Sequence, residues 1–316
     1  MHNFIKQLPF VVLLFLVGCG DPIKAQIEKQ IPVTEAKIAA LGDALESGNV
    51  RNASLIKQYV NKITEAKPEL ATLANEFAKE ATVNGPLYQS LVERLNTVKA
   101  QPQLFESTQA AFDELVNIYQ AADPMLFSDA LSDPLNVLAD MSGGLLPRVN
   151  SLSREQAIAA NKATDYGVGS QLIGNPAYGS WQTGSNGMSF WAWYGMYSMM
   201  GDLFGSRRVY YNDWGRNRGF SYYNDYGRKR YSSPSQLRKQ NQLDTRTKKS
   251  FGNKGFTSAY SKNRTGASGL SKQSQAAQTS SNRFRSATNK RNSTYAKSSS
   301  LRNSSSSTSR GFRRGK

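Results

Sequence analysis

Histidine and cysteine are almost absent from this sequence of 316 residues, which holds only His2 and Cys19. If the N-terminus is processed, the mature chain keeps no histidine and no free thiol. This excludes Ser-His-Asp triads, Cys-His dyads, His or Cys metal sites and internal disulfides, and we predict no catalytic residue, metal or cofactor. Hydrophobic residues make up only 39% of the chain, which is low for a protein folded throughout. Part of the chain is therefore predicted not to fold.

The first 18 residues have the pattern of an export signal. Residues 1–6 are a short polar start with one positive charge, and residues 8–17 are apolar except for Pro9. This apolar run is about half as long as a membrane-spanning helix requires. A charged start, a short apolar run and small residues at its end are typical of a secretory signal, which we predict over 1–18.

The end of this signal, Leu16-Val17-Gly18-Cys19, resembles the lipobox of bacterial lipoproteins. The resemblance implies cleavage before Cys19, a diacylglycerol on its sulfur and an acylated α-amine. Several acyl chains would anchor the protein stably to a membrane. The expected location is the cell envelope, facing the periplasm or the cell surface. The alternatives are an ordinary signal with a chance cysteine, or a buried N-terminal helix.

The net charge of +17 is divided unevenly along the chain. Residues 19–165 contain 13 basic and 19 acidic residues, whereas residues 166–316 contain 26 basic and 4 acidic ones. Seventeen basic residues and no acidic residue follow Asp244. Such asymmetry predicts that the two halves differ in their physical behaviour, and that the basic half has a polyanionic partner.

After a linker over 19–33, residues 34–165 are predicted to form a helical domain. Apolar residues recur there at spacings of three and four, the period of an α-helix. We expect a bundle of four to six helices, and therefore a mainly α protein. Prolines at Pro68, Asn84-Gly85-Pro86 and Pro102 indicate places where a new helix starts. Asp123-Pro124 and Asp133-Pro134 each have the pattern of an N-cap followed by proline at the first helical position, and Ser153 with Gln156 has capping-box spacing.

Residues 166–205 are rich in glycine, aromatics and methionine. The segment from Met188 to Phe204 is uncharged up to Gly201, and Phe190, Trp193, Tyr194, Tyr197 and Phe204 could share one helical face in it. Because tryptophan and tyrosine favour the membrane–water interface, Trp191 and Trp193 are candidate membrane contacts. The alternative is that this segment packs as core or against another copy of the chain.

Residues 206–233 contain a tandem repeat of period 12. YYNDWGRNRGFS starts at Tyr210 and YYNDYGRKRYSS starts at Tyr222, with eight of twelve positions identical. The Asn-Asp-aromatic-Gly runs predict turns at 212–215 and 224–227, between short strands of a small β-meander that includes 209–211 and 220–223. Aromatic and basic side chains beside these turns could bind an anionic ligand, or could only pack and be solvated; the candidates are Trp214, Arg216, Arg218, Tyr226, Arg228, Lys229 and Arg230.

Residues 234–316 are basic and rich in serine, with few apolar residues. Too little apolar area is available to offset the entropy of ordering, so a disordered tail is predicted. If the chain is exported, the polyanions that the tail can meet are lipid headgroups and envelope polymers rather than RNA. A tail that only tethers or solubilises is the alternative.

The lipobox, the Ser189-Phe190-Trp191 to Met199-Met200-Gly201 segment and the Ser/Arg/Gly tail together resemble the YgiB/YjfM-type lipoproteins of Gram-negative bacteria. The resemblance implies a non-catalytic role in the envelope. The predicted function is that of a lipid-anchored protein whose helical domain binds an unidentified protein and whose basic half contacts anionic membrane or polysaccharide. The alternatives are a carboxylate-dependent enzyme acting on cell-wall glycan and an extracytoplasmic nucleic-acid binder.

Overall fold

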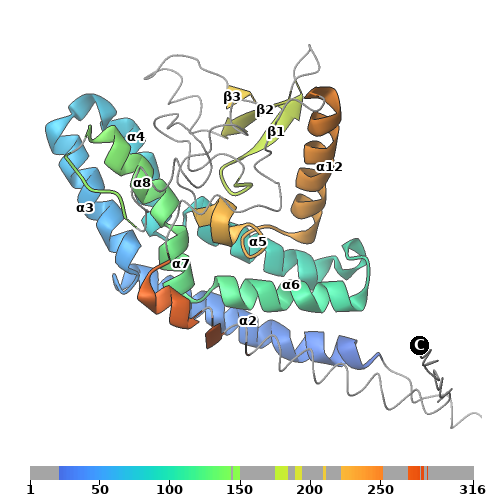
Figure 1. The fold of residues 1–316 in the computed structure, drawn as a ribbon. Helices are drawn as coiled ribbons and strands as arrows, with labels where there is room; N and C mark the ends of the chain where they lie inside the picture. Colours follow the sequence, from blue (N-terminus) through green and yellow to red (C-terminus); the bar gives the residue numbers. More distant parts are fainter. Residues whose placement is uncertain are drawn as a thin grey trace, which may run out of the picture. The chain divides into compact units, whose positions relative to one another are not determined.

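The computed structural model (Figure 1) describes residues 21–143, 145–149, 175–183, 189–193, 209–210, 222–251, 270–277, 279–280 and 283. The chain divides into two units, Met1–Gln278 and Thr279–Lys316, and all elements discussed below belong to the first. The N-terminal helices are α2 (Pro22–Glu46), α3 (Arg51–Ala66), α4 (Ala71–Ala78), α5 (Pro86–Ala100), α6 (Thr108–Ala121), α7 (Pro124–Ala130) and α8 (Ser132–Met141). The later elements are β1 (Gly179–Thr183), β2 (Ser189–Trp193), β3 (Val209–Tyr210), the π-helical turn η5 (Tyr223–Gly227) and α12 (Pro234–Phe251). The protein is therefore mainly α, as the sequence predicts.

The helical bundle has one apolar core. Helix α2 packs along α6 and α5, while α3 packs on α4 and α8; Figure 1 shows α2 and α6 side by side. The residues that recur at helical spacing line this core, because each stripe faces the interior of the bundle. The members of these stripes in this core are Ile38, Leu41, Leu45, Tyr59, Ile63, Leu73, Phe77, Leu87, Leu91, Leu95, Val98 and Leu115. Phe112 and Val116 of α6 are also buried, outside this cluster.

Helix α2 starts earlier than expected. The Asp21 carboxylate accepts a hydrogen bond from the Ile23 N–H at 3.0 Å, and Pro22 occupies the first helical position. Helix α2 then continues through Pro32, so residues 22–33 are helix and not the linker predicted over 19–33. A proline within a helical pattern usually marks the end of the helix, because proline has no N–H to donate to the preceding turn. Here Ile27 and Ile31 pack partly against the core and extend the apolar stripe back to the first turns.

Most of the predicted helix starts are found in the described residues. A 3₁₀ turn begins at Pro68, α5 begins at Pro86, and α7 is capped by Asp123, whose carboxylate accepts from the N–H groups of Met125 and Leu126. Asp133 differs from the prediction, because α8 already begins at Ser132 and Asp133 lies inside its first turn. The predicted capping box of Ser153 and Gln156 lies outside the described residues.

The aromatic segment contains a small antiparallel sheet. Its strand order is β1-β2-β3, with Trp181 opposite Trp191 and Trp191 opposite Val209. A three-stranded meander is therefore present, but two of its strands lie upstream of the repeat. Because β2 spans Ser189–Trp193, Phe190 and Trp193 are not on one helical face as expected. Only the backbone of these strands is described.

The first half of the second repeat copy, residues 222–227, is helical, and turns and bends follow over 228–232. Tyr222 has helical backbone angles (φ −58°, ψ −44°), and η5 follows directly over the positions predicted as a strand end and a turn. Helix α12 then occupies Pro234–Phe251, so the predicted disordered tail does not begin at residue 234. A further short helical stretch covers 272–277. Apart from 270–271, 279–280 and 283, the remainder of the tail lies outside the described residues, as do residues 211–221 of the first copy.

Candidate functional site

Only some of the residues predicted to contact the membrane or an anionic ligand lie within the part of the chain that the structure describes. Cys19, Trp214, Arg216 and Arg218 lie outside the described residues, and of Trp191 and Trp193 only the backbone in β2 is described. The remaining four, Tyr226, Arg228, Lys229 and Arg230, belong to the second copy of the repeat. The second copy, which we call the docking segment (222–233), can therefore be analysed in atomic detail.

The docking segment is attached to α8 through a buried carboxylate. The Tyr222 and Tyr223 N–H groups donate to the two oxygens of Asp133, at 2.7 and 3.0 Å. Asp133 is 2% exposed, so both bonds are shielded from water. Hydrogen bonds that end on a charged group are roughly twice as strong as neutral ones. In the meander expected at 220–223, these two N–H groups would pair with a neighbouring strand. In the structure they donate to Asp133 instead.

The tyrosines of the docking segment are part of the core. Tyr222, Tyr223 and Tyr231 are each at most 2% exposed. The Tyr231 hydroxyl donates to the Ala121 carbonyl at the end of α6, at 3.0 Å, and its ring lies edge-on to Phe127 with centroids 6.4 Å apart. Such edge-to-face ring pairs add to the energy of apolar burial. These side chains stabilise the fold and are not available to an external ligand.

Two arginines fix the same region. The Arg94 Nε donates to Glu114 at 2.7 Å, and its guanidinium also donates to the Arg230 carbonyl at 2.8 Å. Arg94 and Glu114 are both buried, so this ion pair joins α5, α6 and the docking segment inside the core. Arg228 is half-buried and donates to Gln240 and Asn241 of α12, each at 2.8 Å. Arg228 therefore orients α12.

The predicted cluster of basic side chains is consequently split. Arg230 is half-buried, with its Nε enclosed beside Tyr222. Burial raises the pKa of Tyr222 to about 12, although the positive charge of Arg230 acts in the opposite direction. Lys229 is the exposed basic side chain of the docking segment, and Tyr226 is half-buried against Tyr222 with ring centroids 6.0 Å apart. The docking segment joins α12 to the bundle, and its four predicted contact residues differ in exposure.

Helix α12 carries exposed basic residues that the sequence prediction placed in a disordered tail. Arg238, Lys239, Arg246 and Lys249 are all exposed, and Arg238 pairs with Glu106 at 2.8 Å. A signal for this helix was present: Ser233 and Gln236 form a capping box, with Gln236 N–H donating to the Ser233 hydroxyl and Ser233 N–H donating to the Gln236 side chain. Pro234 at the first helical position completes this start signal.

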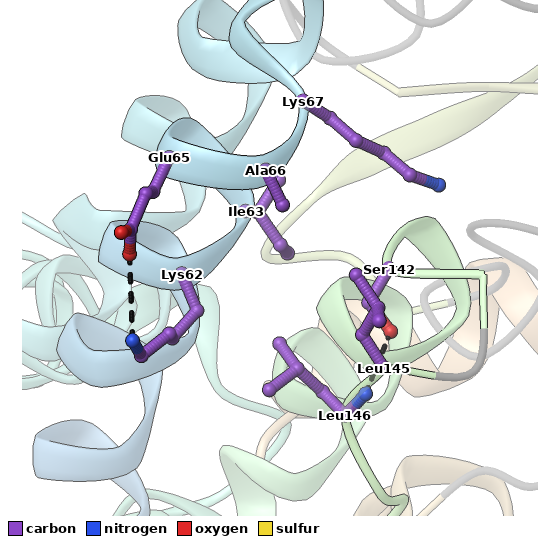
Figure 2. Close-up of a pocket in the computed structure, with 8 residues that line it drawn as sticks. All are labelled: Lys62, Ile63, Glu65, Ala66, Lys67, Ser142, Leu145 and Leu146. Carbon is purple, nitrogen blue, oxygen red and sulfur yellow. Dashed lines mark hydrogen bonds and ion pairs between the residues drawn. The ribbon is translucent and has the colours of Figure 1, made fainter.

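A pocket of about 240 Å³ lies between the end of α3 and the segment after α8. Figure 2 shows Ile63 and Ala66 on one side and Leu145 and Leu146 on the other. Leu145 is 66% exposed, the largest exposure among the large hydrophobic side chains of the described residues. The Lys67 ammonium lies at the rim and donates to the Met141 carbonyl at 3.0 Å. The pocket can accept an apolar side chain next to positive charge.

The carboxylates do not form a glycosidase-like pair in this pocket. Its one carboxylate, Glu65, is exposed and lies 3.4 Å from the Lys62 ammonium. Glu80 is the acid with the most perturbed pKa: burial raises it to about 8, and the Leu87 N–H and the Tyr178 hydroxyl lower it in part. Glu80 is enclosed in the core and does not line the pocket. Within the described residues no group of three or more acidic, His or Cys residues could hold a metal ion.

Comparisons with family models, with curated proteins and with solved structures gave no match to this chain. In the described part of the chain, no helix combines the length and the apolar character needed to cross a membrane.

Proposed function

We propose that this protein is a non-catalytic, lipid-anchored protein of the bacterial cell envelope. Its helical bundle binds a protein partner, and its basic C-terminal half contacts anionic membrane or polysaccharide. The observation that carries this proposal is the exposed basic surface of α12, which the docking segment holds on a bundle of opposite net charge.

The lipobox motif supports the anchor. Cys19 follows an apolar run and small residues, and the described chain begins its first helix at Pro22, directly after it. Acylation at Cys19 would attach the bundle to the membrane through only a few residues. Multiple acyl chains provide stable attachment, whereas one chain binds marginally.

The pocket beside Leu145 supports a protein partner for the bundle. A partner side chain that covers the exposed leucine removes apolar area from water, and this burial drives most protein association. Exposed apolar patches often mark interaction sites for this reason. The partner expected here offers an apolar side chain with a neighbouring acidic group, because Lys67 also lines the pocket, whereas Lys62 is paired with Glu65.

Acylation is tested by labelling cells that express the full-length chain with radioactive palmitate. We expect label in the wild-type protein and none in Cys19→Ser, which should also leave the membrane fraction. An unlabelled wild-type chain would overturn the lipid-anchored function.

Anion contact is tested with the purified mature chain on vesicles and on immobilised acidic polysaccharide. Binding to either one should weaken steeply as salt rises, since exposed charges are screened beyond about 10 Å at 0.1 M ionic strength. Binding that is absent at low salt on both supports would contradict the role of the basic half.

A further inference from the structure

One surface of the helical bundle receives the second copy of the repeat, and four helices contribute to it. The Asp133 carboxylate of α8 accepts the first two N–H groups of that copy, and the Arg94 guanidinium of α5 donates to the carbonyl of its ninth residue. The Ala121 carbonyl at the end of α6 and the Phe127 ring of α7 contact Tyr231. We call these four residues of the bundle the repeat site.

The two copies share features that the repeat site uses in the second copy. Both begin with Tyr-Tyr, and in the second copy the N–H groups of these two residues donate to Asp133. Both also have glycine at the sixth position, Gly215 and Gly227. A Cβ on Gly227 would lie 2.9 Å from the Tyr222 ring, so a side chain there would displace a buried ring. The repeat site therefore suits the motif that the copies have in common.

The positions at which the copies differ divide by burial. Tyr231 and Ser232, the tenth and eleventh residues of the second copy, are 2% and 0% exposed. The first copy has Gly219 and Phe220 at these positions. The other differences are at the fifth and eighth positions, which are half-buried and exposed in the second copy. The two buried differences are therefore the ones that can decide which copy fits.

Glycine at the tenth position would lose two contacts with the bundle. The Tyr231 hydroxyl donates to the Ala121 carbonyl, and its ring packs edge-on against both Phe127 and Tyr222, with centroids 6.4 Å apart in each pair. Such ring pairs stabilise a protein beyond the burial of their area. Glycine has neither a ring nor a hydroxyl, so it would leave a cavity in the core.

Phenylalanine at the eleventh position would not fit the second contact. The Ser232 hydroxyl lies 2.6 Å from the Tyr223 hydroxyl, which also accepts from Gln240 at 2.7 Å. Phenylalanine would remove the bond between the two hydroxyls inside the core, where a lost hydrogen bond is costly. It would also insert a ring at a position that is already fully enclosed, and overpacking destabilises a core.

We propose that the repeat site recognises a single copy of the YYND repeat, and that Tyr231 and Ser232 make it select the second copy over the first. The recognition does not require the proposed lipid anchor. Selection also positions α12, because Arg228 and Tyr223 of the selected copy bond with Gln240. The choice of copy thus decides which segment is fixed to the bundle and how α12 is held.

The test exchanges the tenth and eleventh residues between the copies in the purified mature chain. The exchanged chain keeps the composition of the parent and carries Tyr231→Gly, Ser232→Phe, Gly219→Tyr and Phe220→Ser. Hydrogen exchange measured by mass spectrometry should show protection moving from 222–233 to 210–221. Loss of a buried aromatic side chain changes an equilibrium constant on the order of 100-fold or more, so exchange in the second copy should accelerate on the order of 100-fold.

A matched control changes the two less buried differences instead. Tyr226→Trp and Lys229→Asn give the second copy the residues that the first copy has at its fifth and eighth positions. Exchange over 222–233 should stay close to that of the parent. If the control accelerates this exchange as much as Tyr231→Gly with Ser232→Phe, the selection does not reside at the two buried positions and the proposal is overturned.

The remaining outcomes separate selection from general stability. Unchanged exchange over 222–233 in the chain with only Tyr231→Gly and Ser232→Phe shows that these residues do not select the copy. In the exchanged chain, acceleration in the second copy without new protection in the first shows that the repeat site does not recognise the shared motif. Loss of protection in α3 of the exchanged chain shows that the bundle has opened and that the first copy has not replaced the second. Each of these results overturns the proposal.

Discussion

Replacement of Asp133 by asparagine is expected to loosen the docking segment from the bundle. Asp133 accepts the backbone N–H groups of Tyr222 and Tyr223 with its two oxygens, inside the core. Asparagine has nearly the same shape but only one acceptor oxygen. Its amide nitrogen would face an N–H group, and one buried donor would lose its partner.

The size of this effect follows from the two hydrogen bonds. A bond to a charged acceptor contributes about 1.5–3 kcal/mol, and an unpaired buried donor costs about 1–3 kcal/mol. Losing one bond and weakening the other should therefore lower the free energy of unfolding of this region by about 3 kcal/mol. If the docking segment opens separately from the bundle, amide exchange at Tyr222 and Tyr223 should accelerate on the order of 100-fold.

Hydrogen exchange measured by mass spectrometry, together with urea unfolding, tests this expectation. Asp123→Asn is the matched control, because Asp123 caps α7 and asparagine caps helices equally well. The control also weakens a partly exposed ion pair with Lys37, so its cost should stay below about 1 kcal/mol. Unchanged exchange over 222–231 in Asp133→Asn would refute the assignment of Asp133 as the attachment point.

Two further predictions concern buried charge. The pKa of Glu80 is raised from 4.5 to about 8, so the folded state keeps a proton that the unfolded state releases between these values. The contribution of Glu80 to the free energy of unfolding is thus complete below about pH 4.5 and is lost as pH rises towards 8, by up to roughly 5 kcal/mol. Urea unfolding near pH 5 and near pH 8 should show a smaller decrease in the free energy of unfolding for Glu80→Gln than for the wild type. Equal decreases in the two proteins would contradict this. Arg94→Met should cost about 3–5 kcal/mol because Glu114 remains buried without its partner, and the added change Glu114→Leu should recover most of the loss in denaturant midpoint; a double variant as unstable as the single one would disprove the pairing argument.

The helical bundle could be predicted because its signals are local. The spacing of Ile38, Leu41 and Leu45 already places three side chains on one face of a helix, and these residues are buried in α2. Asp123-Pro124 likewise combines a cap with the residue that best fits the first helical position. Signals of this kind depend on a few neighbouring residues and survive in the folded protein.

The docking segment could not be predicted because its conformation depends on distant partners. Tyr222 and Tyr223 suit a strand by propensity, which is strongly modified by context. Asp133, about 90 residues earlier, accepts their N–H groups and allows a helical backbone instead. Asp133 itself lies in the first turn of α8 and does not cap that helix as expected. Helix α12 was missed for a different reason, since its low apolar content concealed the capping box at Ser233.

The sequence by itself determined the scarcity of reactive side chains, the separation of charge between the two halves and the helical character of the first half, because composition and period are properties of the chain alone. Only the tertiary structure decided which basic residues are exposed. Arg228 is half-buried and bonds to Gln240 and Asn241 of α12, whereas Lys239 and Lys249 on that helix are exposed. Burial depends on which distant segments pack together, so identical residue types near each other in the sequence come to lie in different environments.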